Sequence, residues 1–271
     1  MSNSIKTACL QMCSSSIIED NLSTIAKLLS QAAERGVQLA ILPETFACMT
    51  QNQNQRHDAA HAYQHVLDFL SQQAAQHQMC IVAGSVLYAS EHDDKLRNRC
   101  YVFSSKGTLQ THYDKIHLFD ANLPTEQWQE SVHIEAGTSP TISSYDQDWH
   151  MGLSICYDLR FPELYRYYSA HDCNILTVPA AFTTPTGLAH WEVLLRARAI
   201  ENQCYVLAAA QSGIHMDGRT TYGHSMMIDP WGKVIASLPT GEGIITAELS
   251  LEYLQHSRQY LPVLQHIKDI S

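Results

Sequence analysis

One order of strands and helices occurs twice along this chain, although the residues themselves do not repeat. In the first half, a strand-like segment at 5–12 precedes an amphipathic helix and a short apolar strand at 38–42. A second amphipathic helix then leads to strand-like segments at 79–86 and 99–104. The first helix is expected to end near Gly36. The apolar faces of the two helices consist of Leu22, Ile25, Ala26, Leu29 and Ala33 in the first, and of Tyr63, Val66, Leu67, Leu70 and Ala74 in the second.

The second half follows the same plan. Its expected strands are 151–156, 173–178 and 204–210, its expected helices are 162–169 and 190–202, and hairpin-like segments follow at 224–229, 233–237 and 243–248. Alternating strands and helices imply helices that cover the faces of a sheet. The sequence therefore predicts an α/β protein, a four-layer α-β-β-α sandwich of two mixed sheets with pseudo-twofold halves. We expect one domain over residues 1–271.

The charge balance excludes several classes of partner. The 271 residues include 17 Lys and Arg against 27 Asp and Glu, a formal net charge of -10. Binding to nucleic-acid phosphates requires a basic surface, which such an acidic chain is not expected to provide. No apolar run reaches the roughly 20 residues that cross a bilayer, and the N-terminus has no apolar signal core. We expect a cytoplasmic protein that binds neither nucleic acid nor membrane.

The cysteines do not form a metal or disulfide pattern. There are eight, at 9, 13, 48, 80, 100, 156, 173 and 204, without a CxxC pair. Most are expected to be small buried apolar residues. His57, His61 and His65 are spaced along one expected helix, but they lie opposite its apolar face, and a solvated polar face explains them. We expect no metal and no cofactor.

Three segments carry reactive side chains, two at the ends of buried strands and one in a short polar stretch that leads into an apolar one. Glu44 follows the strand in LAILPETF, Lys115 lies in THYDKIHLF, and Cys156 ends the strand in GLSICYDLRFPEL. Attack on an amide needs a nucleophile, a proton acceptor and groups that stabilise the oxyanion. Cys156 can attack as a thiolate favoured by a nearby cation or helix N-terminus, and Glu44 can take its proton. Lys115 and the backbone N–H of Tyr157 can hold the oxyanion.

Each of these residues also has a simple structural explanation. Glu44 can be a turn carboxylate, Lys115 a solvated loop charge, and Cys156 a core thiol. The three segments in this order favour the chemical interpretation. LPETF, YDKIHLF and GLSICYDLRFPELYR resemble the three signature segments of the carbon–nitrogen hydrolase (nitrilase) superfamily.

The resemblance covers nearly the whole chain and implies an α-β-β-α sandwich with a Glu–Lys–Cys triad. It implies that Glu44 is the base, Lys115 the oxyanion stabiliser and Cys156 the nucleophile, working through a thioester. It also implies that a second glutamate, Glu130 in WQES, positions the substrate and the lysine. A solvent-facing loop carboxylate is the alternative for Glu130.

The segments HWEVLLRARAIENQCYVLAAAQSG and RTTYGHSMMIDPWG are similar to the family branch that contains deaminated glutathione amidase. The resemblance implies hydrolysis of deaminated glutathione to 2-oxoglutarate and cysteinylglycine. It also implies that Arg160, Phe182 and Thr186, the last two in the AAFTTPTG loop, line the substrate pocket. An ion pair between Arg160 and Asp158 is the structural alternative. Leu188 stands where the branch has proline, a change that can reshape the loop that carries Thr186.

Other functions stay open at this stage. An omega-amidase acting on 2-oxoglutaramate uses the same triad, and nitrile hydrolysis is a possible side activity. A different class is a catalytically silent binding partner, although no triad residue is lost. A redox thiol role is weaker, because Cys156 has no nearby resolving cysteine. The expected helix 190–202 carries an apolar stripe of Trp191, Leu194, Leu195 and Ala199, which predicts core packing, while the resemblance implies that such helices meet in a homodimer.

Overall fold

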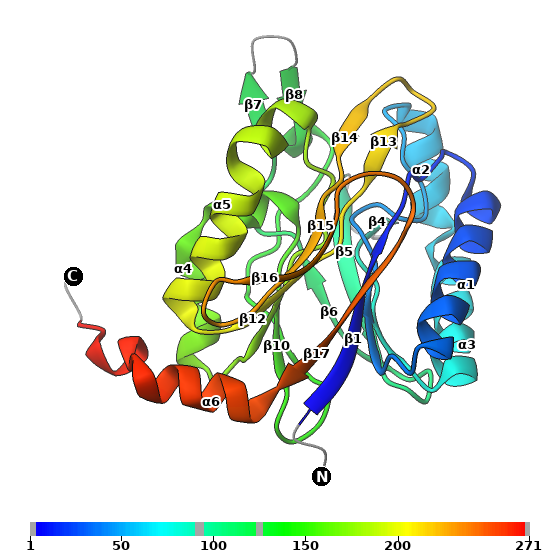
Figure 1. Ribbon diagram of the computed structural model, residues 1–271. Coiled ribbons are helices and arrows are strands. Elements are labelled where there is room, and N and C mark those ends of the chain that lie inside the picture. Colours follow the sequence, from blue (N-terminus) through cyan, green and yellow to red (C-terminus); the bar gives the residue numbers. More distant parts are fainter. Residues whose placement is uncertain (1–3, 90–94, 123–126, 269–271) are drawn as a thin grey trace.

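Two β-sheets lie face to face between two layers of helices (Figure 1). The computed structural model describes residues 4–89, 95–122 and 127–268. In Figure 1, α1 (Ile18–Glu34) and α3 (Tyr63–His77) cover one outer face, and α4 (Pro162–Ala170) and α5 (Thr184–Asn202) cover the other. The predicted four-layer sandwich is confirmed.

The first sheet has the strand order β17-β1-β2-β3-β5-β4, and β6 pairs with β5. Strands β1, β2 and β3 run parallel, whereas β17, β4 and β6 pair antiparallel with their neighbours, so the sheet is mixed as predicted. Its strands are β1 (Ser4–Gln11), β2 (Leu39–Ile41), β3 (Cys80–Val82), β4 (Val86–Ala89), β5 (Leu96–Phe103), β6 (Leu109–Asp114) and β17 (Gly243–Ser250).

The second sheet repeats this arrangement in the order β16-β15-β12-β11-β10-β9. Three parallel strands, β10, β11 and β12, are followed by antiparallel β15, just as β1, β2 and β3 are followed by β5. Its strands are β9 (Ile142–Ser144), β10 (His150–Leu153), β11 (Ile175–Thr177), β12 (Tyr205–Ala208), β15 (Ser225–Ile228) and β16 (Val234–Leu238). Short ribbons are formed by β7 (Asp120–Asn122) with β8 (Gln127–Gln129) and by β13 (Ser212–Ile214) with β14 (Thr220–Tyr222).

Alternation along the strands separates the two cores. In β1, Ile5 and Cys9 join the core that contains the second sheet, while Ala8 and Leu10 join the core beneath α1 and α3. Successive side chains of a strand point to opposite faces, so a strand that is buried on both faces needs apolar residues at odd and even positions alike. This explains why the strands of both halves are continuous apolar runs in the sequence.

Gly152 in β10 allows close packing of α4 on the second sheet. A Cβ at this position would lie 2.3 Å from the ring carbon Cγ of Tyr168 in α4. A larger residue here would push α4 outward, because no heavy atom can be accommodated at that distance.

Four sequence predictions need correction. The C-terminal strand β17 does not close the second half but pairs antiparallel with β1 of the first sheet. The paired residues extend from Ser4 with Ser250 to Gln11 with Gly243. Helix α5 begins at Thr184 rather than at residue 190, because Pro185 fits a first helical turn. Cys156 lies after the end of β10 and opens the 3-10 helix η2 (Cys156–Arg160).

The fourth correction concerns the histidines. His57 and His61 lie in α2 (Gln53–His61) and His65 lies in α3, so they do not share one helix. His65 Nε2 instead lies 2.8 Å from Glu19 Oε1 of α1. Within the described ranges, no three His, Cys, Asp or Glu side chains are placed together in a way that would hold a metal ion.

The chain ends in α6 (Leu251–Tyr260) and the 3-10 turn η3 (Val263–His266), which lie beside the second sheet. Gln203 Nε2 donates to Leu261 O at 2.7 Å, so this segment is attached to the end of α5. No helix in the described part of the chain is long and apolar enough to cross a membrane.

Candidate active site

Four side chains from four separate segments meet between the ends of the two sheets. Glu44 follows β2, Lys115 follows β6, Glu130 opens the 3-10 helix η1 (Glu130–Val132), and Cys156 opens η2. Glu44, Lys115 and Cys156 are 5%, 2% and 9% exposed, and Glu130 is half-buried. Burying charged groups is costly unless they are paired, so the contacts among them decide what the site can do.

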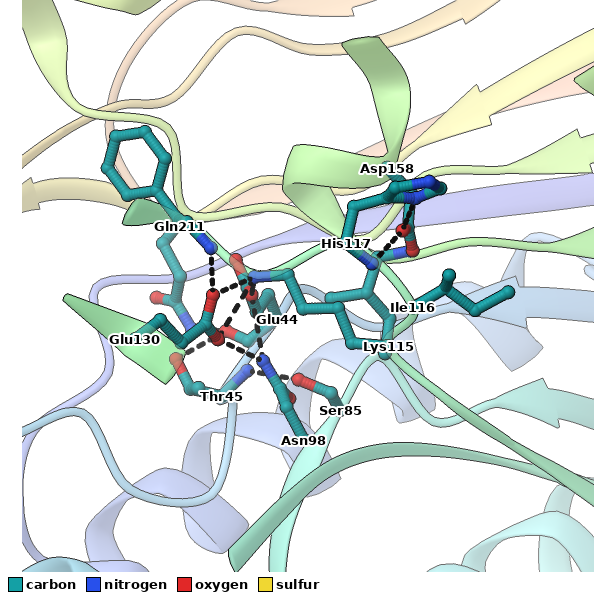
Figure 2. Close-up of polar contacts among 12 residues, drawn as sticks. Glu44, Thr45, Ser85, Asn98, Lys115, Ile116, His117, Glu130, Asp158 and Gln211 are labelled. Carbon is teal, nitrogen blue, oxygen red and sulfur yellow. Dashed lines mark hydrogen bonds and ion pairs between the residues drawn. The ribbon is translucent and has the colours of Figure 1, made fainter. Parts of the chain in front are cut away.

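Lys115 lies between the two carboxylates (Figure 2). Its Nζ donates to Glu44 Oε1 at 3.0 Å, and to Glu130 Oε1 and Oε2 at 3.1 and 2.9 Å. Asn98 of β5 joins the same group, since its Nδ2 donates to Glu44 Oε1 at 3.0 Å and to Glu130 Oε1 at 3.4 Å. The lysine and both glutamates thus form one hydrogen-bonded cluster.

Lys115 and Glu130 hold each other in the ionised state. Burial lowers the pKa of the Lys115 ammonium, but the carboxylates of Glu130 and Glu44 outweigh it and keep that pKa well above its usual value. Burial raises the pKa of Glu130, but the Lys115 charge and the N–H of Phe119, at 2.7 Å, outweigh it and lower that pKa. Lys115 is therefore a fixed cation at neutral pH.

Cys156 has a left-handed backbone, with φ at 50°, which turns the chain sharply after β10. Such a conformation costs a non-glycine residue of order 1–3 kcal/mol and persists where the surroundings enforce it. Here the Cys156 N–H donates to Pro179 O at 2.8 Å. The strained turn places the thiol beside Glu44, whose carboxylate is close enough to raise the pKa of the thiol.

The surroundings of Cys156 favour the protonated thiol, in agreement with the expected role of Glu44 as its base. Burial raises the pKa of Cys156 well above its usual value, and the Glu44 carboxylate raises it further. Lys115 lowers the pKa, but by too little to reverse the shift. Attack by this cysteine therefore requires a base, and Glu44 is the carboxylate beside it.

Hydrogen bonds and close backbone packing fix the loop that carries Glu44. Gln211 Nε2 donates to the Glu44 carbonyl at 3.0 Å, and the Thr45 N–H donates to Ser85 Oγ at 3.0 Å. Gly84, with φ at 36°, lies so close that a Cβ would come 1.9 Å from Pro43 O. Only glycine allows these two loops to pack together.

Asp158 joins the lysine segment to the cysteine segment. Its Oδ2 accepts from Tyr113 at 2.7 Å and from the Ile155 N–H at 2.8 Å, and its Oδ1 accepts from the His117 N–H at 2.9 Å. With these partners Asp158 does not serve as the ion-pair partner of Arg160. The Arg160 guanidinium instead lies 5.6 Å from the Tyr157 ring centroid and 5.4 Å from that of Phe182, with Nη1 at 3.2 Å from His190 Nδ1.

Two connected spaces open at Cys156. A cavity of about 260 Å³ is bounded by all four of Glu44, Lys115, Glu130 and Cys156. A narrower recess, which shares Cys156 with the cavity, is lined by Phe119, Cys156, Tyr157, Arg160, Ala181, Phe182, Thr183 and Thr186. All eight candidate residues from the sequence thus lie around this one site.

Leu188 does not disturb this site. Thr186 is buried in the first turn of α5, not in a loop, and its Oγ1 lies 2.9 Å from Thr183 Oγ1. Leu188, two residues further along, is 71% exposed. Leu188 therefore points to solvent, and the helix itself fixes Thr186.

Sequence reasoning missed Asn98, Arg56 and Arg219. Asn98 could have been noticed in the sequence. It is a polar residue in β5 on the same strand face as Leu96 and Cys100, which are both buried. Arg56 of α2 and Arg219, between β13 and β14, border the larger cavity. Their own segments are polar and exposed, so nothing in the local pattern distinguishes them.

Comparison with known proteins agrees with this geometry. Residues 6–259 match the family model described as carbon-nitrogen hydrolase. A Synechocystis protein named deaminated glutathione amidase is 41% identical over 263 residues, which cover 96% of both chains. A mouse protein of the same name is 40% identical over 253 residues, 92% of this chain and 78% of the relative.

Solved structures share the fold. The NitFhit protein of Caenorhabditis elegans superposes with a TM-score of 0.91 at 36% identity, covering 98% of this chain, which spans 65% of that longer protein. Nit3 of Saccharomyces cerevisiae, a nitrilase superfamily member, gives a TM-score of 0.86 at 30% identity over 97% of this chain and 96% of its own. This protein therefore belongs to the carbon–nitrogen hydrolase family.

Proposed function

We propose that this protein is an amidase that cleaves its substrate through a thioester on Cys156. The observation that carries the proposal is the buried cluster in which Lys115 contacts both Glu44 and Glu130, bordering one cavity together with the Cys156 thiol. A base, a cation and a nucleophile around one cavity are what acyl transfer from an amide requires.

In the first step, Cys156 Sγ attacks the amide carbon as Glu44 removes the thiol proton. The carbonyl oxygen becomes an oxyanion, which the Lys115 ammonium and the Tyr157 N–H stabilise. Glu44 then transfers its proton to the amine nitrogen as the C–N bond breaks. The acyl group remains on Cys156 as a thioester, and the amine departs.

Water completes the cycle from the side that the amine has left. Glu44, again a carboxylate, takes a proton from water as its oxygen attacks the thioester carbon. The C–S bond breaks, the carboxylic acid product forms, and the proton returns to the Cys156 sulfur. Glu130 and Asn98 hold Lys115 and Glu44 in place throughout, so no cofactor is needed.

The substrate that we propose is deaminated glutathione, which would yield 2-oxoglutarate and cysteinylglycine. Relatives of that name are 38–41% identical to this chain over nearly its whole length. The narrow recess supports the proposal, because Arg160 offers a planar guanidinium to the carboxylate of the 2-oxo acid. Phe182 and Thr186 form the rest of its wall.

The test is a comparison of two substrates. We expect release of 2-oxoglutarate from deaminated glutathione with a kcat/KM at least about tenfold above that for 2-oxoglutaramate, since binding energy from remote groups raises rates. An enzyme-coupled assay of 2-oxoglutarate measures both. The reverse preference would make the protein an omega-amidase. Inactivity on both substrates would contradict the proposed substrate, while amide hydrolysis through Cys156 would still be proposed.

We also propose that the protein is a cytoplasmic homodimer, built from single-domain chains that meet through α5. In the predicted stripe, Trp191, Leu195 and Ala199 are buried in the chain's own core and Leu194 is partly buried against it, so the stripe serves core packing as predicted. The outer side of α5 carries Val193, 68% exposed, and Ile200, 47% exposed, and exposed apolar patches mark contact sites.

Light scattering at micromolar concentration is expected to give the dimer mass. Replacing Val193→Asp and Ile200→Asp together should give the monomer, because the charges would be buried unpaired in the interface. Ile17→Asp is the matched control, since Ile17 is 47% exposed but is the N-cap residue of α1, a helix of the opposite outer layer (Figure 1). A monomeric parent protein, or a double variant that remains dimeric, would contradict this interface.

A further inference from the structure

Two arginines, Arg56 and Arg219, border the larger cavity. Arg56 projects from α2, and Arg219 comes from the turn between β13 and β14. In the described part of the chain, neither guanidinium forms an ion pair, and Arg219 Nε is a buried nitrogen without a hydrogen-bond partner. The Arg219 guanidinium lies 5.3 Å from the ring centroid of Trp128 in β8, which holds it over the cavity.

The electrostatic balance of the cavity favours an anion at this place. Lys115 with Glu44 and Glu130 carries a formal charge of minus one, and the two arginines bring the total to plus one. Burial lowers the pKa of both Arg56 and Arg219, and the charge of Arg219 lowers the pKa of Arg56 further, while nearby carboxylates offset part of both shifts. A bound carboxylate would relieve the repulsion between the two arginines and supply the missing acceptor for Arg219.

The position of Glu44 determines which part of the substrate lies on this side. Glu44 must give its proton to the leaving amine, and it borders the larger cavity with Arg56 and Arg219. The narrow recess contains Arg160 but neither Glu44 nor Lys115. The acyl part therefore belongs in the recess and the leaving amine in the larger cavity.

We infer that Arg56 and Arg219 bind a free carboxylate on the leaving amine, so that the preferred substrates are amides between a 2-oxo acid and the N-terminus of an amino acid or short peptide. This inference rests on the proposed function and extends it to the leaving group. The substrate then carries one carboxylate toward Arg160 and a second toward Arg56 and Arg219, with the scissile bond at Cys156.

The experiment changes the carboxylate and the arginine separately. Deaminated glutathione is compared with its C-terminal glycinamide, in which a neutral carboxamide replaces the carboxylate, and each is tested with the parent enzyme and with Arg219→Gln. The parent enzyme should prefer the acid by about 10- to 100-fold in kcat/KM, as expected for charge-assisted hydrogen bonds. Arg219→Gln should remove this preference by raising KM for the acid, while kcat/KM for the amide stays within about twofold.

Further variants make the result specific. Arg56→Gln should behave like Arg219→Gln, Arg219→Lys should retain part of the preference for the acid, and Arg35→Gln, at an exposed position of the helix end, should leave it unchanged. Activity of each variant on 2-oxoglutaramate, whose leaving group is ammonia, shows that the variant is folded.

Three results would overturn the inference. If the parent enzyme had equal kcat/KM for the acid and the amide, Arg56 and Arg219 would not bind the carboxylate, and the proposed function would still stand. Equal losses on acid, amide and 2-oxoglutaramate in Arg219→Gln would mean that the arginine only supports the charge of Glu44 and Glu130. No hydrolysis of deaminated glutathione by the parent enzyme would overturn the proposed function together with the subsite.

Discussion

Replacing Cys156→Ala should lower kcat/KM by at least about 10⁴-fold while the protein stays folded, because loss of a nucleophile removes the covalent route altogether. The change takes away one sulfur atom that borders a cavity, so little packing is lost. Alanine meets the same left-handed backbone at φ 50° as cysteine does. Turnover of deaminated glutathione and the thermal unfolding midpoint, measured on the same sample, check the two halves of this expectation.

Cys48 provides the matched control. It also borders the larger cavity and is 7% exposed, but its Sγ lies 3.6 Å from the carbonyl of Ser16 rather than against a carboxylate. Cys48→Ala should therefore keep kcat/KM within about threefold of the parent, as expected away from the reacting atoms. A Cys156→Ala variant with normal turnover would assign the nucleophile elsewhere, and a parent protein without turnover would favour the silent binding partner.

Much of this architecture could be predicted because it depends on local patterns. The continuous apolar runs that become β2, β3, β10 and β11 are visible in the sequence, since strands buried on both faces need apolar residues at every position. Glu44 is recognisable because this charged residue directly follows such a run, whereas Lys115 follows the largely polar strand β6 and is marked by the signature segment YDKIHLF. The order of elements then leads to the sandwich.

The features that were missed depend on contacts between distant segments. The pairing of β17 with β1 joins residues more than 230 positions apart, and no periodicity indicates which sheet receives the last strand. Arg56 and Arg219 become neighbours of the site only because α2 and the β13–β14 turn lie at the same end of the molecule (Figure 1). The protonation state of Cys156 likewise depends on burial, which the surrounding sequence letters do not reveal.

The second large effect is expected at Lys115. Replacing Lys115→Met keeps the length of the side chain but leaves the carboxylates of Glu44 and Glu130 without their shared cation. Removing one member of a buried ion pair costs about 3–5 kcal/mol, because the remaining charge is left uncompensated. The same change removes an oxyanion donor, which alone costs about 10²–10³-fold in kcat. The urea unfolding midpoint and kcat measure these two losses.

A second substitution in the same chain separates the structural role of Lys115 from its catalytic role. Adding Glu130→Gln to Lys115→Met removes one uncompensated carboxylate, and the amide can still accept from the Phe119 N–H. The unfolding midpoint should therefore recover in part, whereas turnover should stay low, because no cation faces the oxyanion. Lys27→Met, at an exposed position on α1, should change neither quantity. If Glu130→Gln restored turnover together with stability, Lys115 would act only as a counter-charge, and oxyanion stabilisation would have to come from backbone groups such as the Tyr157 N–H.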